Sequence, residues 1–338
     1  MKLVSFQREQ RDHLAIYYQD MLYPLQSLDP SMPGNMLQFL QAGQWAMDKA
    51  RRFDQMIKEE GVDVEPYDFY RENILSPLPN PESCRDAYAF RQHVATARQN
   101  RGLDMIPEFD QFPVFYFTNH KAIYGPGEIP IMPDHLQKLD YELEIAIVTG
   151  KSGRNIRAEN ADNYIAGFMI MNDLSARQLQ MEEMKLNLGP AKGKDFASSF
   201  GPWLVTPDEL APHSTNPREG HTGTNYNLTM KAYINGELYS EGNFAEMDWT
   251  FAEILERVSY GVDIYPGEII GSGTVGTGCL LEINGTEARK NPDYEPKWLN
   301  ENDQITLEVS ELGQLTNTFS QSNHDYSLFD LKKMSHQS

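Results

Sequence analysis

The side chains of this chain that could do chemistry include two glutamates in a segment of alternating character. Across residues 139–148, apolar residues occupy every second position, and Asp140, Glu142 and Glu144 stand between them. Successive side chains of a β-strand point to opposite faces, so the alternation predicts a strand with one apolar and one acidic face. Glu142 and Glu144 would present two carboxylates to one point, where a cation could bind. A solvated acidic face explains the segment equally simply when it is taken alone.

A second candidate pair is Asp86 and His93, which are seven residues apart. They lie in a segment, residues 83–97, that lacks Gly and Pro and is rich in helix-forming residues, so it predicts a helix. On a helix the two side chains would share a face about 10 Å apart along the axis. One could then bind a metal while the other reaches across a substrate. A surface Asp and His without function are the alternative.

A third group follows residues 164–171, whose apolar character predicts a strand. Asp173 stands where this strand gives way to a predicted helix, and an N-cap is the plain interpretation. Arg177 and Gln180 would then share one helix face with it, at i, i+4 and i+7. A carboxylate, a guanidinium and an amide so aligned could serve a metal and a carboxylate-bearing substrate. An ordinary Asp–Arg salt bridge accounts for the first two equally well.

Two loops complete the set of candidates. Lys194 lies in a glycine-containing loop and could place a positive charge on a substrate oxygen, or could simply be solvated. Residues 271–276 fit the pattern G-x-G-x-x-G. Dinucleotide binding requires a helix after this pattern, whereas residues 280–285 predict a strand and a turn. The sequence therefore predicts a tight loop beside a pocket, with Glu282 at its exit as a candidate carboxylate or a plain strand residue.

These motifs occur in a fixed order along about residues 83 to 310, and the ordered set is specific. The segments are Arg85-Asp86, Arg91-Gln92-His93, Asp140-Tyr141-Glu142-Leu143-Glu144, Asn172-Asp173 with Arg177, Gly193-Lys194-Asp195-Phe196, Gly201-Pro202-Trp203, Ser272-Gly273-Thr274 and Leu281-Glu282. Together they resemble the fumarylacetoacetate hydrolase family. Because His93 lies in an Arg-Gln-His segment, the resemblance is to fumarylacetoacetase-type hydrolases more than to the decarboxylases and hydratases of the family.

The resemblance implies a divalent cation held by Asp86, Glu142, Glu144 and Asp173. Physical chemistry agrees, because four carboxylates around one point repel one another without a cation. Ligation by oxygen alone suits Mg²⁺ or Ca²⁺ rather than Zn²⁺. We therefore expect Mg²⁺, with Ca²⁺ or Mn²⁺ as alternatives.

The resemblance also implies the catalytic residues. His93 would be the general base that activates water, and Glu282 would fix its tautomer and stabilise the imidazolium. The remaining roles concern the substrate, whose oxygens would be bound and polarised by Arg177, Gln180 and Lys194 and contacted by Tyr88 and Thr274.

The function implied is metal-dependent hydrolysis of a carbon–carbon bond in a β-diketone acid, fumarylacetoacetate- or acylpyruvate-like, as in the breakdown of aromatic compounds. The first alternative is decarboxylation or hydration of a 2-oxo acid on the same metal site, which does not require a His–Glu base. A non-catalytic acidic protein that binds Ca²⁺ is the second alternative, and it assigns no role to Arg177 or Lys194.

The elements that must position these residues form a predominantly β body. Beyond Gly102, short strand-like segments alternate with turns such as Asn235-Gly236, a typical hairpin signal. The proline-rich residues 75–81 predict a domain boundary. The resemblance then implies an α+β, mainly β fold, in which a mixed β-sandwich roll forms the catalytic domain at residues 76–338. A small N-terminal domain would occupy residues 1–75, with a strand at 2–6 and a helix at about 35–60.

Composition limits the class of partner. The net charge of −20 over 338 residues argues against nucleic acid and anionic membranes, because both would repel the protein. Neither a signal-peptide core nor a membrane-spanning apolar run is evident. Two cysteines far apart give no disulfide framework, which favours a reducing compartment. We therefore expect a cytoplasmic protein that binds a small oxo acid, and the resemblance adds a homodimer.

Overall fold

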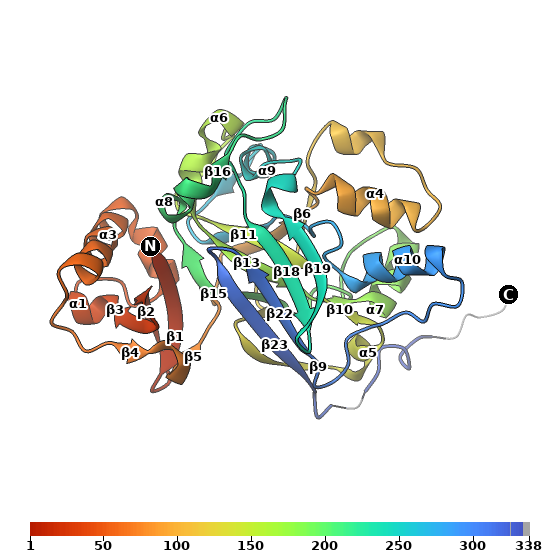
Figure 1. Cartoon of the computed structure of the whole chain (residues 1–338), viewed down its shortest axis with the longest axis horizontal. Helices are drawn as coiled ribbons and strands as arrows, with labels where there is room; N and C mark the ends of the chain where they lie inside the picture. The colour runs from red at the N-terminus through yellow and green to blue at the C-terminus, as the bar shows by residue number, and fades with distance from the viewer. Residues whose placement is uncertain (325, 334–338) are drawn as a thin grey trace.

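The computed structural model describes residues 1–324 and 326–333, and two β-sheets dominate it (Figure 1). The larger sheet has the strand order β4 (Tyr67–Asp68), β3 (Met21–Pro24), β2 (Arg11–Tyr18), β1 (Lys2–Arg8), β15 (Ser198–Val205), β13 (Ile165–Asp173), β11 (Leu143–Thr149), β21 (Glu268–Gly271), β6 (Ser83–Ala87) and β7 (Phe115–Phe117), with β5 (Asn73–Ile74) and β8 (Ile123–Tyr124) at its side. The smaller sheet has the order β19 (Glu237–Asn243), β18 (Thr229–Ile234), β22 (Gln304–Val309), β23 (Gly313–Gln321) and β9 (Gly127–Ile131). This is the mainly β fold that the sequence predicts.

Helices and short strand pairs surround the sheets. The helices are α1 (Leu25–Leu28), α2 (Met36–Ala42), α3 (Gln44–Glu59), α4 (Arg91–Gln99), α5 (Pro133–Leu136), α6 (Ala158–Ala161), α7 (Arg177–Glu183), α8 (Pro207–Leu210), α9 (Phe251–Val258) and α10 (Leu280–Lys290). The short pairs are β10 (Leu139–Asp140) with β14 (Ser175–Ala176), β12 (Gly153–Arg154) with β20 (Asp263–Ile264), and β16 (Ser214–Thr215) with β17 (Asn225–Tyr226). No helix in the described part of the chain is long and apolar enough to cross a membrane.

Strand β11 is buried on both faces, so the alternative of a solvated acidic face is wrong. One face, with Ile145 and Ile147, packs into the core that includes residues of the smaller sheet. The other face, with Ala146 and Val148, packs into a second core that includes α2 and α3. Strands covered on both faces are apolar throughout except where polar side chains have partners. The glutamates therefore need partners at the end of β11, and they find them in the site described below.

The N-terminal residues extend the large sheet, because β1 pairs with β15. The single helix predicted at about 35–60 is divided at Gly43, whose φ of 74° ends α2 before α3 begins. Left-handed backbone of this kind favours glycine. Trp45, in the first turn of α3, is 50% exposed. The domain boundary near residue 75 stays a prediction.

Three local predictions in the second half of the chain are wrong. Residues 83–87 form β6 rather than the first turn of a helix, because they pair with β21 in parallel. Residues 280–283, predicted as a strand, begin α10. The helix predicted at Asp173 begins only at Arg177. By contrast, the hairpin predicted at Asn235-Gly236 is confirmed.

The polar segment after β23 is attached to α5. Asp134 accepts hydrogen bonds from Ser327 Oγ at 2.8 Å and from the backbone N–H of Leu328 at 2.6 Å. Lys332 pairs with Glu182 of α7. This segment is therefore tied to α5 and to α7, and α7 contributes residues to the cavity described below.

Candidate active site

Four buried acidic side chains meet at one end of the large sheet. Asp86 comes from β6, Glu144 from β11, Asp173 from the end of β13, and Glu142 from the residue before β11. Each offers a carboxylate oxygen, and these oxygens lie within 4.8 Å of one another. The structure thus brings together all four residues that the sequence predicts as metal ligands, although Asp86 lies on a strand and not on a helix face with His93.

Gly271 makes this convergence possible, because β21 lies between β11 and β6. Gly271 pairs with Asp86 on one side and with Ala146 on the other. A Cβ atom at this position would collide with Asp86 Oδ1 and would lie 3.1 Å from Glu144 Oε2. The next glycine, Gly273, donates its backbone N–H to the same two atoms at 3.0 and 3.2 Å. A residue without a side chain therefore leaves the space in which the two carboxylates approach.

The carboxylates are not electrostatically equivalent. Burial, and next the charge of Asp173, raises the pKa of Asp86 to about 8. Burial, and next the charge of Asp86, raises the pKa of Glu144 well above its ordinary value. Burial also opposes ionisation of Glu142, but Lys194 and Arg177 outweigh it and lower the pKa of Glu142 to about 2. The site therefore lacks positive charge on the side of Asp86 and Glu144.

A divalent cation fits this arrangement of donors. Lys194 Nζ lies 2.7 Å from Asp173 Oδ2 and also pairs with Glu142. No lysine or arginine of the described residues forms an ion pair with Asp86 or Glu144. All four donors are carboxylate oxygens, which hard ions such as Mg²⁺, Ca²⁺ and Mn²⁺ prefer. The raised pKa values of Asp86 and Glu144 agree with this, because a cation beside the two carboxylates would favour their charged forms.

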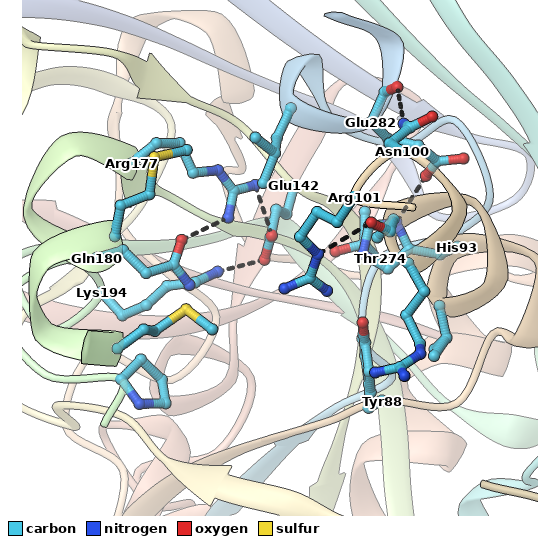
Figure 2. A pocket seen from close by; sticks show the side chains of 18 of the residues that line it. Tyr88, His93, Asn100, Arg101, Glu142, Arg177, Gln180, Lys194, Thr274 and Glu282 are labelled. Carbon is cyan, nitrogen blue, oxygen red and sulfur yellow. Dashed lines mark hydrogen bonds and ion pairs between the residues drawn. The ribbon is translucent and has the colours of Figure 1, made fainter. Parts of the chain in front are cut away.

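A histidine and a glutamate form a dyad that faces Glu142 across a cavity (Figure 2). His93 Nδ1 lies 2.6 Å from Glu282 Oε2, and both side chains are buried. His93 lies on α4 and Glu282 on α10, two helices in contact. Asn100 ties them together by donating its amide to the Glu282 carbonyl at 3.0 Å. With Nδ1 bound to a carboxylate, Nε2 is the nitrogen that can exchange a proton with a substrate or a water molecule.

The guanidinium of Arg177 connects several groups of the site. Its Nε donates to Asp140 Oδ2 at 2.8 Å, its Nη2 to Glu142 Oε1 at 2.7 Å and its Nη1 to Gln180 Oε1 at 3.0 Å. The alternative of a salt bridge between Asp173 and Arg177 is therefore wrong. Asp173 is also no N-cap, because it ends β13 and a short strand separates it from α7.

A cavity of about 930 Å³ lies between the two groups. Its walls include most of the predicted site residues: Asp86, Tyr88, His93, Glu142, Arg177, Gln180, Lys194, Thr274 and Glu282. Much of the remaining wall is apolar and is formed by Val94, Ile106, Val114, Met181, Leu188 and Trp298, among others. Glu144 and Asp173 do not line this cavity, but their carboxylate oxygens lie within 4.8 Å of those of Asp86 and Glu142, which do.

Sequence reasoning missed three residues of this site. Tyr116 lines the cavity and donates its hydroxyl to Asp173, from a strand that places it opposite Asp86. Arg101 adds a positive charge to the cavity wall. Asp140 is fully buried and binds Arg177. The sequence pointed only to Asp140, which is the first acid of the alternating segment. Tyr116 and Arg101 are brought to the site by strand pairing and loop folding, which their spacing does not reveal.

The prediction that a strand follows the loop at residues 271–276 is wrong. The loop leads into α10 after all, so the reason given for excluding a dinucleotide was wrong. The exclusion itself has a different basis. The Gly273 N–H, which would face a phosphate in a nucleotide site, donates to Asp86 and Glu144. Buried carboxylates at this position repel a phosphate.

Known proteins resemble the chain in sequence and in fold. Residues 83–320 match the family model for the C-terminal part of fumarylacetoacetate (FAA) hydrolase. The chain is 29% identical over 297 residues to a mitochondrial oxaloacetate tautomerase of Rattus norvegicus, covering 87% of this chain and 82% of the relative. It is 25% identical over 293 residues to an oxaloacetate tautomerase of Bacillus subtilis, covering 85% of this chain and 87% of the relative.

Two solved structures share the fold. The fumarylacetoacetate hydrolase of Exiguobacterium antarcticum aligns with a TM-score of 0.69 at 24% identity, covering 95% of this chain and all of that chain (100%). The maleylpyruvate hydrolase of Sphingobium sp. SYK-6, in complex with manganese(II) and pyruvate, aligns with a TM-score of 0.67 at 17% identity, covering 96% and 100%.

Proposed function

Because this chain belongs to the fumarylacetoacetate hydrolase family, we propose that it hydrolyses a carbon–carbon bond of a β-diketone acid of the acylpyruvate type in a metal-dependent reaction. One observation carries the proposal. The dyad of His93 and Glu282 faces the acid cluster across a cavity, so a base and a cation site lie on opposite sides of the space for a substrate.

The residues that would hold the cation are Asp86, Glu142, Glu144 and Asp173. A bound divalent cation supplies Lewis-acid polarisation and a fixed position for the oxygens of a 2-oxo acid. Lys194 and Gln180 line the cavity beside this point. Their N–H groups can donate to substrate oxygens and hold the dioxo unit with its distal carbonyl toward His93.

The chemical step that we propose uses His93 as the base. Nε2 takes a proton from a water molecule, and Glu282 stabilises the imidazolium through Nδ1. The water oxygen forms a bond to the distal carbonyl carbon. The carbon–carbon bond then breaks, and its electron pair leaves with the 2-oxo acid fragment as an enolate. The proton held on His93 goes to that carbon, so the products are a carboxylic acid and pyruvate.

The size and lining of the cavity support a substrate larger than oxaloacetate. Its volume of about 930 Å³ lies near the upper end of the range for drug-sized ligands. The cavity wall also includes Val94, Ile106 and Trp298. Burial of apolar acyl groups against such a wall is favourable. An acylpyruvate would place its oxo acid at the acids and its acyl chain against these residues.

The experiment is a panel of acylpyruvates assayed by the loss of their ultraviolet enol absorbance, with Mg²⁺, Mn²⁺ or EDTA. Because enol loss alone does not prove cleavage, pyruvate and the carboxylic acid are quantified in the same samples. We expect one of each per substrate consumed, only with metal. Loss of the enol without pyruvate would contradict the proposal.

A second candidate is keto–enol tautomerisation of a 2-oxo dicarboxylate. It is favoured by the names of the relatives in Rattus norvegicus and Bacillus subtilis. The same dyad would move a proton between carbon and oxygen without water attack. Accelerated decay of enol-oxaloacetate with no cleavage of any acylpyruvate would select this function.

The assembly and the compartment stay predictions. We propose that the chain forms a homodimer, which light scattering coupled to gel filtration measures directly. A monomer mass at assay concentrations would contradict it.

A further inference from the structure

The position of His93 depends on the start of α4. His93 is the third residue of this helix, so it lies in the first turn. The first N–H groups of a helix have no partner within the helix and need one from outside. Phe90 precedes the helix, and its apolar side chain can accept no hydrogen bond. The turn that carries the proposed base must therefore be fixed by another part of the chain.

Asp248 supplies this partner from the segment before α9. Its Oδ2 accepts the backbone N–H of Arg91, the first helical residue, at 2.8 Å. Its own backbone N–H donates to the carbonyl of Ala89 at 3.0 Å, and that of Trp249 donates to the same carbonyl at 3.4 Å. Asp248 is only 7% exposed. The segment thus holds the chain on both sides of the helix start, and the carboxylate also complements the positive end of the helix dipole.

We propose that Asp248 is a positioning residue for the reaction, which caps α4 from a distance and so keeps His93 against Glu282. It does not line the cavity and touches no metal ligand, so it acts only through the helix. The inference rests on the proposed role of His93 as the base. It adds a residue, far from the family's motifs in this sequence, on which the geometry of the dyad depends.

The chain offers a matched control for this proposal. The other oxygen of Asp248, Oδ1, pairs with the guanidinium of Arg218. The Arg218 side chain is 50% exposed, and ion pairs of this kind contribute little. Arg218→Ala removes the ion pair and leaves the cap. Asp248→Asn also removes the charge, but its amide oxygen can accept the Arg91 N–H in place of the carboxylate.

The experiment compares Asp248→Ala, Asp248→Asn and Arg218→Ala in the full chain. We expect Asp248→Ala to lower kcat by about 10-fold, because a shift in the first turn of α4 misplaces His93 relative to the substrate. KM and Mn²⁺ affinity should stay within about 2-fold, because the acid cluster lies on other elements. Asp248→Asn and Arg218→Ala should retain kcat. This split between kcat and KM, with rescue by Asn, is not expected of general destabilisation.

Hydrogen exchange of the peptide that covers residues 90–95 gives a second readout without turnover. It should accelerate in Asp248→Ala and stay slow in Asp248→Asn and Arg218→Ala. Unchanged kcat and exchange in Asp248→Ala would overturn the proposal. If Asp248→Ala does not fold, a 10-fold loss of kcat in folded Asp248→Asn would overturn it. If the wild type cleaves no acylpyruvate, the proposed function fails, and the exchange data still decide whether Asp248 caps α4.

Discussion

His93 Nδ1 lies 2.6 Å from Glu282 Oε2, although the two residues are 189 positions apart in the chain. Asp140 fixes the helix that carries Glu282, because its carboxylate accepts the N–H groups of Leu280 and Leu281 at 2.7 and 3.0 Å. The same carboxylate accepts from Arg177 Nε. One buried aspartate therefore sets both the orientation of the dyad and that of a guanidinium in the cavity wall.

Replacement of Glu282 by Gln should separate the geometry of the dyad from its charge. The amide retains the shape of the carboxylate but does not stabilise an imidazolium, so we expect kcat to fall by roughly 100-fold or more. KM should change little. Glu287→Gln, the same change at a partly exposed position on the same helix, is the control and should retain activity. Steady-state kinetics on an acylpyruvate measures kcat and KM of both variants. A Glu282→Gln protein with the kcat of the wild type would rule out a catalytic role for the dyad.

Glu144→Gln should have opposite effects on the metal-free and the metal-bound protein. Burial and the nearby Asp86 raise the pKa of Glu144, so a neutral side chain relieves repulsion and should raise the melting temperature without metal. The loss of one ligand should weaken Mn²⁺ binding at least about 10-fold, and the melting temperature should rise less when Mn²⁺ is added. Glu237→Gln, on an exposed hairpin, is the control. If Mn²⁺ raised the melting temperature of Glu144→Gln as much as that of the wild type, this result would argue against a cation at this cluster.

Gly271→Ala tests whether the space between β11 and β6 is required. The added Cβ would collide with Asp86 Oδ1 and lie 2.7 Å from Met171 Sδ. We expect a loss of about 1–3 kcal/mol in the free energy of unfolding, as overpacking usually causes, together with weaker Mn²⁺ binding. Gly34→Ala is the control, because its Cβ meets only the flexible end of Gln26 at 3.2 Å. Urea unfolding and Mn²⁺ titration measure the two effects, and unchanged values for Gly271→Ala would refute the packing argument.

His135 predicts a specific dependence of stability on pH. Its ring stacks on Phe196 with centroids 4.1 Å apart, and burial, with a contribution from Lys192, lowers its pKa to about 4. The unfolded chain takes up this proton near pH 6.5, so between pH 6.5 and 4 the unfolded state binds more protons. The free energy of unfolding should therefore decrease as pH falls through this window, by up to about 3 kcal/mol.

The matching variant is His135→Gln, which cannot titrate in this range. Its unfolding free energy should fall less steeply between pH 6.5 and 4 than that of the wild type. Urea titrations at several pH values measure the slope. Identical slopes in both proteins would show that His135 does not account for the acid sensitivity.

The sequence allowed the acid cluster to be predicted, because the ordered motifs named all four acids. Their meeting depends on strand order, and the alternating segment and residues 164–171 were predicted as strands. Local propensity failed where distant partners decided the structure. Residues 83–87 favour a helix by composition, but pairing with β21 makes them a strand. Residues 280–283 are a short run, apolar except for Glu282, that periodicity alone does not assign. The Asp140 carboxylate accepts the N–H of Leu280 and so fixes the start of a helix there.

The residues that the sequence did not predict, in the site and beside it, were missed for one reason. Tyr116 reaches Asp173 because β7 pairs with β6, and no spacing in the sequence encodes that pairing. Asp248 meets the start of α4 from a segment 157 residues away from Arg91. Such contacts depend on the complete fold, so they become visible only when the elements are placed in space.

The most direct test of the central claim is a parallel measurement on His93→Ala. The variant lacks the base but keeps the four acids, so we expect it to lose turnover of the acylpyruvate that the wild type cleaves best. Its Mn²⁺ affinity, measured by calorimetry, should stay within about 2-fold of the wild type. Retained cleavage, or a parallel loss of Mn²⁺ binding, would contradict the division of the site into a metal centre and a separate base.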